Sequence, residues 1–473
     1  MLRKLHGLAK ELTQVVGKER KLPESILREA GGKVFTYGSF RLGVYGPGSD
    51  IDTLMVAPKH VSRPDFFRLM PDLLRKTFED IPELVPVPDA GVPIIKLELE
   101  GINIDLIFSN LQVSSVPPSL ELTDNQLLRG LDEIDMRCVN GTRVTDRILL
   151  LVPQTKVFRL ALRAIKLWAQ RRAIYGNVVG FPGGVAYAML VARVCQLYPR
   201  ASASLIVSRF FWLYKNWNWP QPVLLQGRED GPLSLREWDP NTSFGDRKHL
   251  MPIITPAYPS MNSTHTIVPS TKQVLLNELE RGLAIVQAIY AGTRQWRDLF
   301  ERHTFFSTGY KHYITVISAS KTKEDQQKWQ GLVQSRLRHL VMKIEEVQSG
   351  VDLAVPFNKG FERVHECKTA DDIEKTLQGS LEFQAKDTKT ETAEQTADVM
   401  QQAAQQVDAE GTPMPATNGT NGVESTDSAI KKDKASGAQM IYSTTFYVGL
   451  NLKPSMSRLI VLGSFKANVS YRC

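Results

Sequence analysis

The chain has 473 residues, 42% of them hydrophobic, which is enough for several folded domains rather than one. Its formal net charge of +8 permits a polyanionic partner without requiring one. Four scattered cysteines exclude a disulfide framework and a cysteine-ligated metal site, and the sequence contains neither a signal peptide nor an apolar run long enough to cross a membrane.

The first predicted elements lead into a glycine-rich stretch. Leucines at helical spacing predict an amphipathic helix over residues 2–19, and a short strand is expected at 34–37. Gly38 and Ser39 then form a small turn, followed by a glycine-rich loop. An apolar run at 52–57 predicts the next strand.

Two carboxylates, Asp50 and Asp52, stand at the head of that strand. Residues i and i+2 of a strand share a face about 6–7 Å apart, so the two carboxylates are expected side by side. Like charges repel unless a cation lies between them, and Mg²⁺ prefers oxygen ligands. An Asp-x-Asp pair alone is more often a solvated loop, but the preceding Gly-Ser turn suits a polyphosphate. The pattern predicts a metal-dependent site for a nucleoside triphosphate.

A third carboxylate follows further along the chain. A helix is predicted over 61–78, and two strands joined by a turn at 100–101 are predicted within 92–108. Asp105 lies between apolar residues of the second strand. Burying a lone carboxylate is costly unless it is paired or binds a metal. Asp105 is therefore either a structural residue or, beside the first motif, the third carboxylate of the site.

The middle of the chain is predicted to be helical, with helices over 153–175, 185–197 and 271–300 and proline-rich loops at 220–265. Thr155 is a candidate cap for the first of these helices.

Three features of the middle region have two interpretations each. Lys166 lies beside an apolar stripe, where it either extends to solvent or binds a phosphate as a point charge. Arg171 and Arg172 form either a solvated helix end or a contact to an RNA backbone. The aromatic residues of 205–219 could stack on bases, but their helical spacing favours a place in the core.

From about residue 303 the pattern changes. Strands are expected at 310–318, 351–355 and 441–452, with a long helix at 325–347, which predicts a sheet backed by helices.

Residues 385–437 contain no aromatic residue and cannot bury enough apolar surface to fold, so we expect a disordered insertion there. The last twenty residues end without a completed element pattern.

Several long stretches, in the right order, resemble the eukaryotic nuclear poly(A) polymerase family, of the fungal type. They are residues 35–43, 46–52, 92–96, 140–146, 162–172, 180–185, 217–222 and 254–259. The resemblance covers about residues 30–350, with a fragment near 440–452. The Gly-Ser turn with Asp-x-Asp is shared by many nucleotidyltransferases, whereas the longer stretches together are specific to this family.

The resemblance implies an α+β, multidomain fold. It comprises a polymerase-β-like nucleotidyltransferase domain at 1–150, a helical middle domain at 151–302 and an RRM-like (ferredoxin-like) RNA-binding domain at 303–473. The insertion at 385–437 falls within the last domain, which is expected to be truncated. ATP is expected to bind between the first two domains.

The resemblance also implies roles for individual residues. Asp50, Asp52 and Asp105 match the catalytic, metal-binding triad, which would hold two Mg²⁺ ions, with Mn²⁺ as a substitute. The matching ATP-binding residues are Gly38 and Ser39 at the triphosphate, Lys166 and Tyr175 at the phosphates, Val92, Asn177, Gly184 and Val185 around the adenine, and Asn140 near the sugar.

The implied function is template-independent addition of AMP from ATP to mRNA 3′ ends by two-metal-ion nucleotidyl transfer. One alternative is a truncated, weakly active or inactive protein that binds RNA or processing factors; the complete triad disfavours it and the short ends favour it. A second alternative, uridylyl or CCA addition, is disfavoured by the long family matches. The expected partners are ATP, an RNA 3′ end and subunits of the cleavage and polyadenylation complex, with no membrane, for a monomer in the nucleus.

Overall fold

The computed structural model describes residues 1–227, 231, 233–346, 350–385 and 438–453. The chain divides into two compact units, Met1–His303 and Thr304–Cys473. Apart from Ala385, the insertion predicted at 385–437 lies outside the described residues, as does the end of the chain from residue 454.

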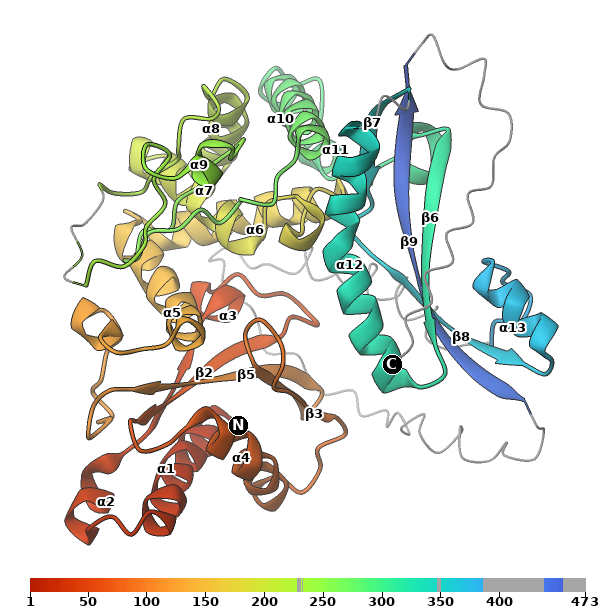
Figure 1. Ribbon diagram of the computed structural model, residues 1–473. Helices are drawn as coiled ribbons and strands as arrows, with labels where there is room; N and C mark the ends of the chain where they lie inside the picture. Colours follow the sequence, from red (N-terminus) through yellow and green to blue (C-terminus); the bar gives the residue numbers. More distant parts are fainter. Residues whose placement is uncertain (228–230, 232, 347–349, 386–437, 454–473) are drawn as a thin grey trace. The chain divides into compact units, whose positions relative to one another are not determined.

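The first unit contains a five-stranded mixed sheet in the order β1-β2-β5-β4-β3 (Figure 1). Strands β2 and β5 are parallel, and the other neighbours are antiparallel. The turn predicted at 100–101 joins β4 to β5, which confirms the predicted hairpin. The strands are β1 (Lys33–Thr36), β2 (Ile51–Pro58), β3 (Leu84–Val87), β4 (Ile94–Leu99) and β5 (Ile102–Leu111).

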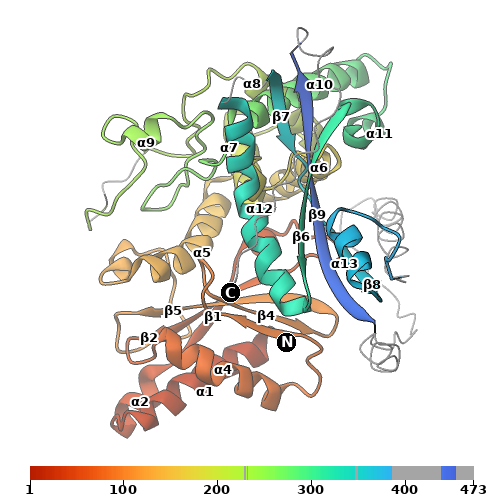
Figure 2. The same cartoon turned by 45° about the vertical axis from the view of Figure 1, so that its right-hand side comes forward.

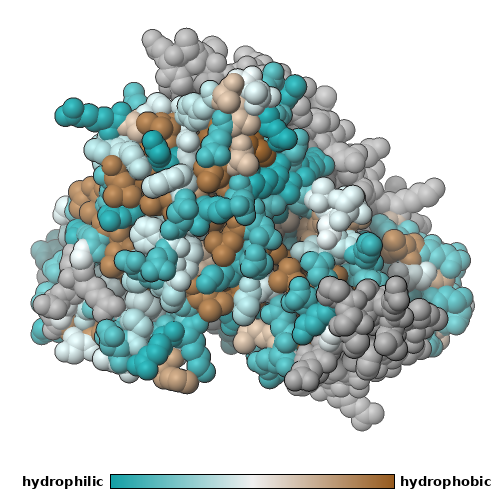
Figure 3. Space-filling view, turned by 90° about the horizontal axis from the view of Figure 1, so that it is seen from above, coloured by the Kyte–Doolittle hydropathy of each residue, from teal (hydrophilic) through white to brown (hydrophobic). Residues whose placement is uncertain are grey.

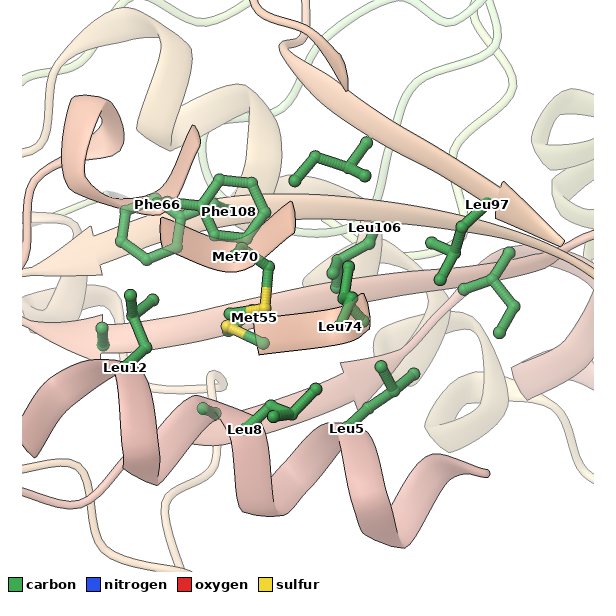
Figure 4. Close-up of a cluster of buried hydrophobic side chains, with 14 of the residues drawn as sticks. Leu5, Leu8, Leu12, Met55, Phe66, Met70, Leu74, Leu97, Leu106 and Phe108 are labelled. Carbon is green, nitrogen blue, oxygen red and sulfur yellow. The ribbon is translucent and has the colours of Figure 1, made fainter. Parts of the chain in front are cut away.

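Helices α1 (Leu2–Glu19) and α4 (Arg63–Thr77) pack on one face of this sheet, which confirms the two helices predicted there. The short helix α2 (Glu24–Ala30), which follows α1 and packs against it, is not predicted from the sequence. Apolar side chains from α1, α4 and the strands interdigitate in one core (Figure 4), where burial of each large side chain contributes about 1.5–3 kcal/mol. The labelled members are Leu5, Leu8, Leu12, Met55, Phe66, Met70, Leu74, Leu97, Leu106 and Phe108.

The opposite face of the sheet is covered by helix α5 (Glu133–Leu151), against which the short helix α3 (Gly38–Leu42) lies. Neither helix is predicted. A turn and a loop are expected from the sequence where α3 forms. Helix α5 escapes detection because its buried face includes polar residues such as Arg143 and Thr145, which interrupt the apolar period.

The middle of the chain is helical, as predicted. The main helices are α6 (Thr155–Arg171), α7 (Gly184–Leu197), α8 (Ala203–Lys215) and α10 (Pro269–Tyr290), with the short helices α9 (Phe244–Arg247) and α11 (Trp296–Leu299). Short 3₁₀ segments lie at Asn125–Leu128 and Asn177–Val179. Thr155 is the first residue of α6 rather than its cap; the cap position is Gln154, which makes no capping bond with its side chain.

Aromatic side chains form the centre of this helical region. Trp168, Phe210 and Phe211 are fully buried and contact one another edge to face at 4.9–6.0 Å between ring centroids. This packing confirms that the predicted aromatic stretch belongs mainly to the core, although Trp212 on α8 is 44% exposed.

Arg172, which follows α6, does not form a solvated helix end, and the contact of Arg171 and Arg172 with an RNA backbone stays a prediction. The Arg172 guanidinium pairs with both carboxylate oxygens of Glu278 at 2.8 and 2.9 Å, and both side chains are largely buried. Arg171 and Arg172 also donate hydrogen bonds to the carbonyls of residues 300–302. These arginines therefore fix the chain where the first unit ends.

The second unit opens with a π-helical turn (Phe305–Gly309) and contains a four-stranded antiparallel sheet whose central strand is β9 (Gln439–Leu452). One edge of β9 pairs with β6 (His312–Ser320), and the other pairs with β7 (Val351–Pro356) and β8 (Phe361–Cys367). Helix α12 (Lys323–Glu346) packs on this sheet, and α13 (Ala370–Leu377) lies against β8 (Figure 2). Strand β8 and helix α13 are not predicted; the other elements are.

In the described residues, no helix is both long and apolar enough to cross a membrane. On the face shown in Figure 3, apolar side chains lie in scattered groups between hydrophilic ones, which is the ordinary surface of a folded protein.

Candidate active site

The structure places Asp52 and Asp105 opposite each other on the parallel strands β2 and β5, where their Cα atoms are register partners. Asp50 lies one residue before β2 and is exposed, so it stands just outside the strand that is predicted to carry it. Its charge still acts on both Asp52 and Asp105. The strand register brings Asp52 and Asp105 together across 53 positions of sequence.

The carboxylates influence one another's ionisation. Burial and the charges of Asp105 and Asp50 raise the pKa of Asp52 to about 6, while Lys166 acts in the opposite direction. Burial also raises the pKa of Asp105, against the lowering effect of Lys96 and with a further rise from Asp50. A concentration of negative charge in a half-buried place favours binding of a cation.

Carboxylate oxygens are the ligands that hard divalent cations prefer, so the donor set at this site fits such an ion. Within the described residues, however, no three Asp, Glu, His or Cys side chains converge closely enough to hold a metal ion. Asp50 is the exposed member of the predicted triad. The shared role of Asp50, Asp52 and Asp105 as metal ligands stays a prediction.

Gly38 brings the backbone against the carboxylate. It opens helix α3 in a left-handed conformation (φ 61°), and a β-carbon built on it would lie 2.1 Å from Oδ2 of Asp52. Its N–H donates a hydrogen bond to Oγ1 of Thr145 on α5, at 3.3 Å. Ser39 follows Gly38 in α3 and is half-buried. The Gly-Ser turn is thus in place beside the acidic pair, as expected from the sequence.

Lys166 and Tyr175 reach the same region from the helical part of the unit. Lys166 Nζ donates to the carbonyl oxygen of Val44 at 3.2 Å and is half-buried, so it does not extend to solvent. Burial lowers its pKa, and Asp52 partly restores it. Burial also raises the pKa of Tyr175, with a further rise from Asp52. Asp52 therefore interacts electrostatically with Lys166, and its charge also acts on Tyr175, as expected of groups around one site.

The Tyr175 ring is held in a fixed orientation. It stacks on Tyr187 with centroids 5.9 Å apart and planes 8° from parallel. A β-carbon on Gly184, the first residue of α7, would lie 2.6 Å from the Tyr175 hydroxyl oxygen. The glycine therefore leaves room for this hydroxyl.

The residues predicted to contact the base and the sugar differ in their hydrogen bonding and in their exposure. Oδ1 of Asn177 accepts a 2.6 Å hydrogen bond from the Thr266 hydroxyl. Oδ1 of Asn140, on α5, is buried without a hydrogen-bond partner, as expected of an atom that meets a ligand. Val92 and Val185 are 36% and 40% exposed, before β4 and on α7. Their placement around one adenine stays a prediction.

Two hydroxyl groups at the site are not predicted from the sequence. Thr145 lies in the stretch 140–146 that resembles the family, so that match could have found it. Thr266 lies outside every matched stretch and comes to Asn177 across 89 positions of sequence, so no local pattern signals it.

The site combines two carboxylates on adjacent strands, a backbone turn beside them and a half-buried lysine whose charge acts on one of the carboxylates. These are features of enzymes that transfer nucleotidyl groups to a hydroxyl. The fold and the site therefore define this protein as a nucleotidyltransferase. Three family models then match nearly the whole chain: the poly(A) polymerase nucleotidyltransferase domain at residues 1–152, the central domain at 157–302 and the predicted RNA binding domain at 304–473. The chain belongs to the poly(A) polymerase family.

Curated relatives support this assignment. Poly(A) polymerase PAPalpha of Candida albicans is 56% identical over 369 residues, which cover 77% of this chain and 66% of the relative. Poly(A) polymerase pla1 of Schizosaccharomyces pombe is 48% identical over 461 residues, covering 96% and 76%. The chain thus spans about two thirds to three quarters of their lengths. The expected resemblance to fungal poly(A) polymerases is confirmed, and the RNA-binding match extends beyond residue 452, where the resemblance was expected to end.

Among solved structures, a Cid1 poly(U) polymerase is 14% identical with a TM-score of 0.42, covering 64% of this chain and 92% of that one. Cid1 in complex with the UTP analog UMPNPP has a TM-score of 0.43 over the same shares. Similarity this low carries no argument about the nucleotide. Family membership makes the chain a polynucleotide adenylyltransferase with a mixed α/β, multidomain fold. Enzymes of this type use divalent metal ions and bind nucleotide and RNA.

Proposed function

We propose that this chain adds AMP from ATP, without a template, to the 3′ end of mRNA. The observation that carries the chemistry is the register pair of Asp52 and Asp105 against the Gly38 backbone. Divalent cations, Mg²⁺ with Mn²⁺ as a substitute, would lower the pKa of the RNA 3′-hydroxyl and neutralise the departing pyrophosphate when bound to Asp50, Asp52 and Asp105. The family assignment favours catalysis over a protein that only binds RNA or processing factors.

The protein's own groups position the reactants. Gly38 and Ser39 leave the backbone of α3 open to a triphosphate, since Gly38 has no side chain. Lys166 supplies a compact positive charge, and Tyr175 supplies a hydroxyl at the same place. Phosphoryl transfer depends mainly on such positioning and electrostatic stabilisation. Asn140 offers a buried, unpartnered oxygen to the ribose.

Adenine selection is assigned to Asn177 and Thr266. Because the Thr266 hydroxyl donates to Oδ1 of Asn177, the amide presents its Nδ2 hydrogens to the base. Adenine offers an acceptor at N1 and matches these donors. Guanine carries a hydrogen at N1 and uracil carries one at N3, so at these ring positions the Asn177 amide would face a donor. Rejection of their carbonyl acceptors, and of N3 of cytosine, needs further contacts.

The RRM-like assignment of the second unit is part of the proposal. Its elements follow the order β6, α12, β7, β8, α13, β9, which is that of a split βαβ module. Aromatic rings gather on it: Phe306 is 45% exposed and contacts Tyr313, Phe361 and Tyr447 at 5.2–5.9 Å. Single-stranded RNA is bound by stacking its bases on such rings. A Phe306→Ala chain that binds oligoadenylate as tightly as the wild type would contradict this part.

Recruitment and location follow from family membership alone. We expect a nuclear monomer that works with subunits of the cleavage and polyadenylation complex.

Primer extension tests the proposed activity. The purified chain is mixed with a labelled oligoadenylate, Mg²⁺ and each of the four nucleoside triphosphates in turn. We expect ladders with ATP alone. A folded, monodisperse chain that binds RNA but extends it with no nucleotide would favour the binding protein, and ladders with UTP would favour uridylyl transfer.

A further inference from the structure

Helix α6 carries a row of three basic side chains, each of which donates a hydrogen bond to one of three successive backbone carbonyls. The bonds run from Arg159 Nε to Leu42 O at 2.9 Å, from Arg163 Nη2 to Gly43 O at 2.8 Å and from Lys166 Nζ to Val44 O at 3.2 Å. Positions i, i+4 and i+7 lie on one face of an α-helix. We call Arg159, Arg163 and Lys166 the basic row.

The carbonyls bound by the two arginines belong to the end of helix α3. Leu42 is the last residue of α3, and Gly43 caps it in a left-handed conformation (φ 73°). The final carbonyls of a helix have no donor within the helix, and nearby positive charge is favourable there. Arg159 and Arg163 supply these donors. Because a helix of five residues is not stable alone, its position depends on contacts of this kind.

The other end of α3 is held from helix α5. The Gly38 N–H donates to Thr145 Oγ1. Helix α5 also contacts the last turn of α3, where Arg41 forms a 2.8 Å ion pair with Asp146. Helix α3 is therefore held by α5 at Gly38 and Arg41 and by the basic row at its end. Since α3 is a single short turn, a shift of its end moves Gly38 and Ser39 as well.

Gly43 and Arg159 are sterically matched. A β-carbon built on Gly43 would lie 2.6 Å from Nε of Arg159, the atom that donates to Leu42. A glycine at this position leaves the guanidinium free to reach the carbonyl.

The arginines of the row are not used to neutralise carboxylates. In the described part of the chain, neither Arg159 nor Arg163 forms an ion pair with Asp or Glu, and their hydrogen bonds go to neutral carbonyls. Because the contact is with neutral backbone oxygens, the donated hydrogen matters more than the charge.

We propose that Arg159 and Arg163 are positioning residues for nucleotidyl transfer: through the carbonyls of Leu42 and Gly43 they hold α3 where Gly38 and Ser39 meet the triphosphate. This inference rests on the proposed function, which assigns the triphosphate to that turn.

A substitution series separates donor from charge. At each arginine, Lys keeps charge and donor, and Met keeps the apolar stem but neither. At Arg159, Gln places a neutral donor where Nε lies; at Arg163 the donor is Nη2, which Gln is too short to replace. Affinity for a nonhydrolysable ATP analogue is measured by calorimetry, and apparent KM values for ATP and for oligoadenylate are measured by extension. Lys156→Gln, an exposed cation on the same helix, is the control.

We expect each Met variant to bind the ATP analogue about three- to tenfold more weakly, the loss of one hydrogen bond. The Lys variants and Arg159→Gln should stay within about twofold of the wild type, and the KM for oligoadenylate should not change. Gly43→Ala should weaken binding of the ATP analogue as the Met variants do, because its methyl group disturbs the contact with Arg159 from the side of α3. Thermal unfolding shows which variants are folded, and Gly43→Ala and Arg159→Gln keep the test available if a Met variant is not.

Three results would overturn the inference. Wild-type affinity in both Met variants would show that the contacts do not position the turn. An Arg159→Gln variant as weak as Arg159→Met would indicate a direct charge contact with phosphate. A defect in oligoadenylate KM alone would indicate an RNA contact. If instead the wild type and Lys156→Gln fail to extend RNA with ATP, the proposed function fails, not the positioning role.

Discussion

Gly38 lies so close to Asp52 that a β-carbon built on the glycine would stand 2.1 Å from Oδ2 of the carboxylate. The turn that is to hold the triphosphate and the acid that is to act beside it are thus in direct contact. Any side chain at position 38 displaces one of them.

The Gly38→Ala substitution should reduce extension by at least about a hundredfold, because the methyl group must push Asp52 away and small displacements at a reacting centre are costly. Gly48→Ala is a matched control. Gly48 also has a positive φ, 72°, but a β-carbon at this position would have no neighbouring atom within 4 Å, so the variant carries the same backbone strain of about 1–2 kcal/mol without the clash. Equal losses of extension in the two variants would show that strain alone matters.

The Asp105→Asn substitution should abolish elongation while leaving the fold intact, because it removes a charge without removing volume. We expect a loss of at least about a hundredfold. Glu98→Gln, on the neighbouring strand β4, removes a carboxylate outside the acidic pair and should have little effect. Extension by a folded Asp105→Asn chain at a rate near that of the wild type would exclude Asp105 as the third carboxylate.

The raised pKa of Asp52 predicts that the stability of the chain depends on pH. Its pKa in the folded chain is raised from 3.8 to about 6. Between these values the folded state binds more protons than the unfolded state, so the free energy of unfolding falls as pH rises through this window. Asp52→Asn removes the effect. Without divalent ions, it should stabilise the chain at pH 7 by up to about 3 kcal/mol and hardly at all below pH 4. Urea unfolding at both pH values measures the difference, and an equal gain at both would contradict it.

The Lys166→Ala substitution should weaken ATP binding about tenfold or more, because it removes the compact charge assigned to the phosphates. Lys156→Ala, which removes an exposed lysine from the same helix, is the control. An unchanged apparent affinity for ATP would mean that Lys166 binds the carbonyl of Val44 but does not contact ATP.

The Thr266→Val substitution should relax nucleotide selection. Valine keeps the shape but not the hydroxyl, so the Asn177 amide is free to turn its oxygen toward the base. The ratio of kcat/KM for ATP over GTP should fall by about tenfold, and Thr266→Ser should restore it. If neither Thr266→Val nor Asn177→Ala changes the ratio of kcat/KM for ATP over GTP, the adenine is not bound by Asn177.

Local sequence predicts those parts of the fold in which apolar residues recur with a regular period. The hairpin of β4 and β5 is predictable from alternating residues and a glycine turn, and Asp105 is conspicuous because it interrupts an apolar strand. Helix α5 cannot be predicted in this way, because Arg143 and Thr145 lie on its buried side. Strand register lies outside local sequence as well: the sequence predicts Asp105 as a third carboxylate of the site, but not that it is the register partner of Asp52.

The contacts that complete the site join distant positions. Thr145 meets Gly38 across 107 residues, and Arg159 meets Leu42 across 117. Their residue types are common and their bonds involve backbone atoms, which leave no signature in a sequence. Family resemblance supplied the candidates Lys166, Tyr175 and Asn177; the structure supplied the groups that hold two of them in place, Val44 and Thr266.

The central position of β9 sets the order in which the protein matures during synthesis. Strands β6, β7 and β8 pair with β9 and not with one another, yet β9 is the last of the described strands to leave the ribosome. Until residue 452 has emerged, three strands have open edges, which invite wrong pairing. The sheet of the first unit is complete at Leu111 and can form on the growing chain. The sheet of the first unit can therefore be complete well before that of the second unit, which must wait for β9.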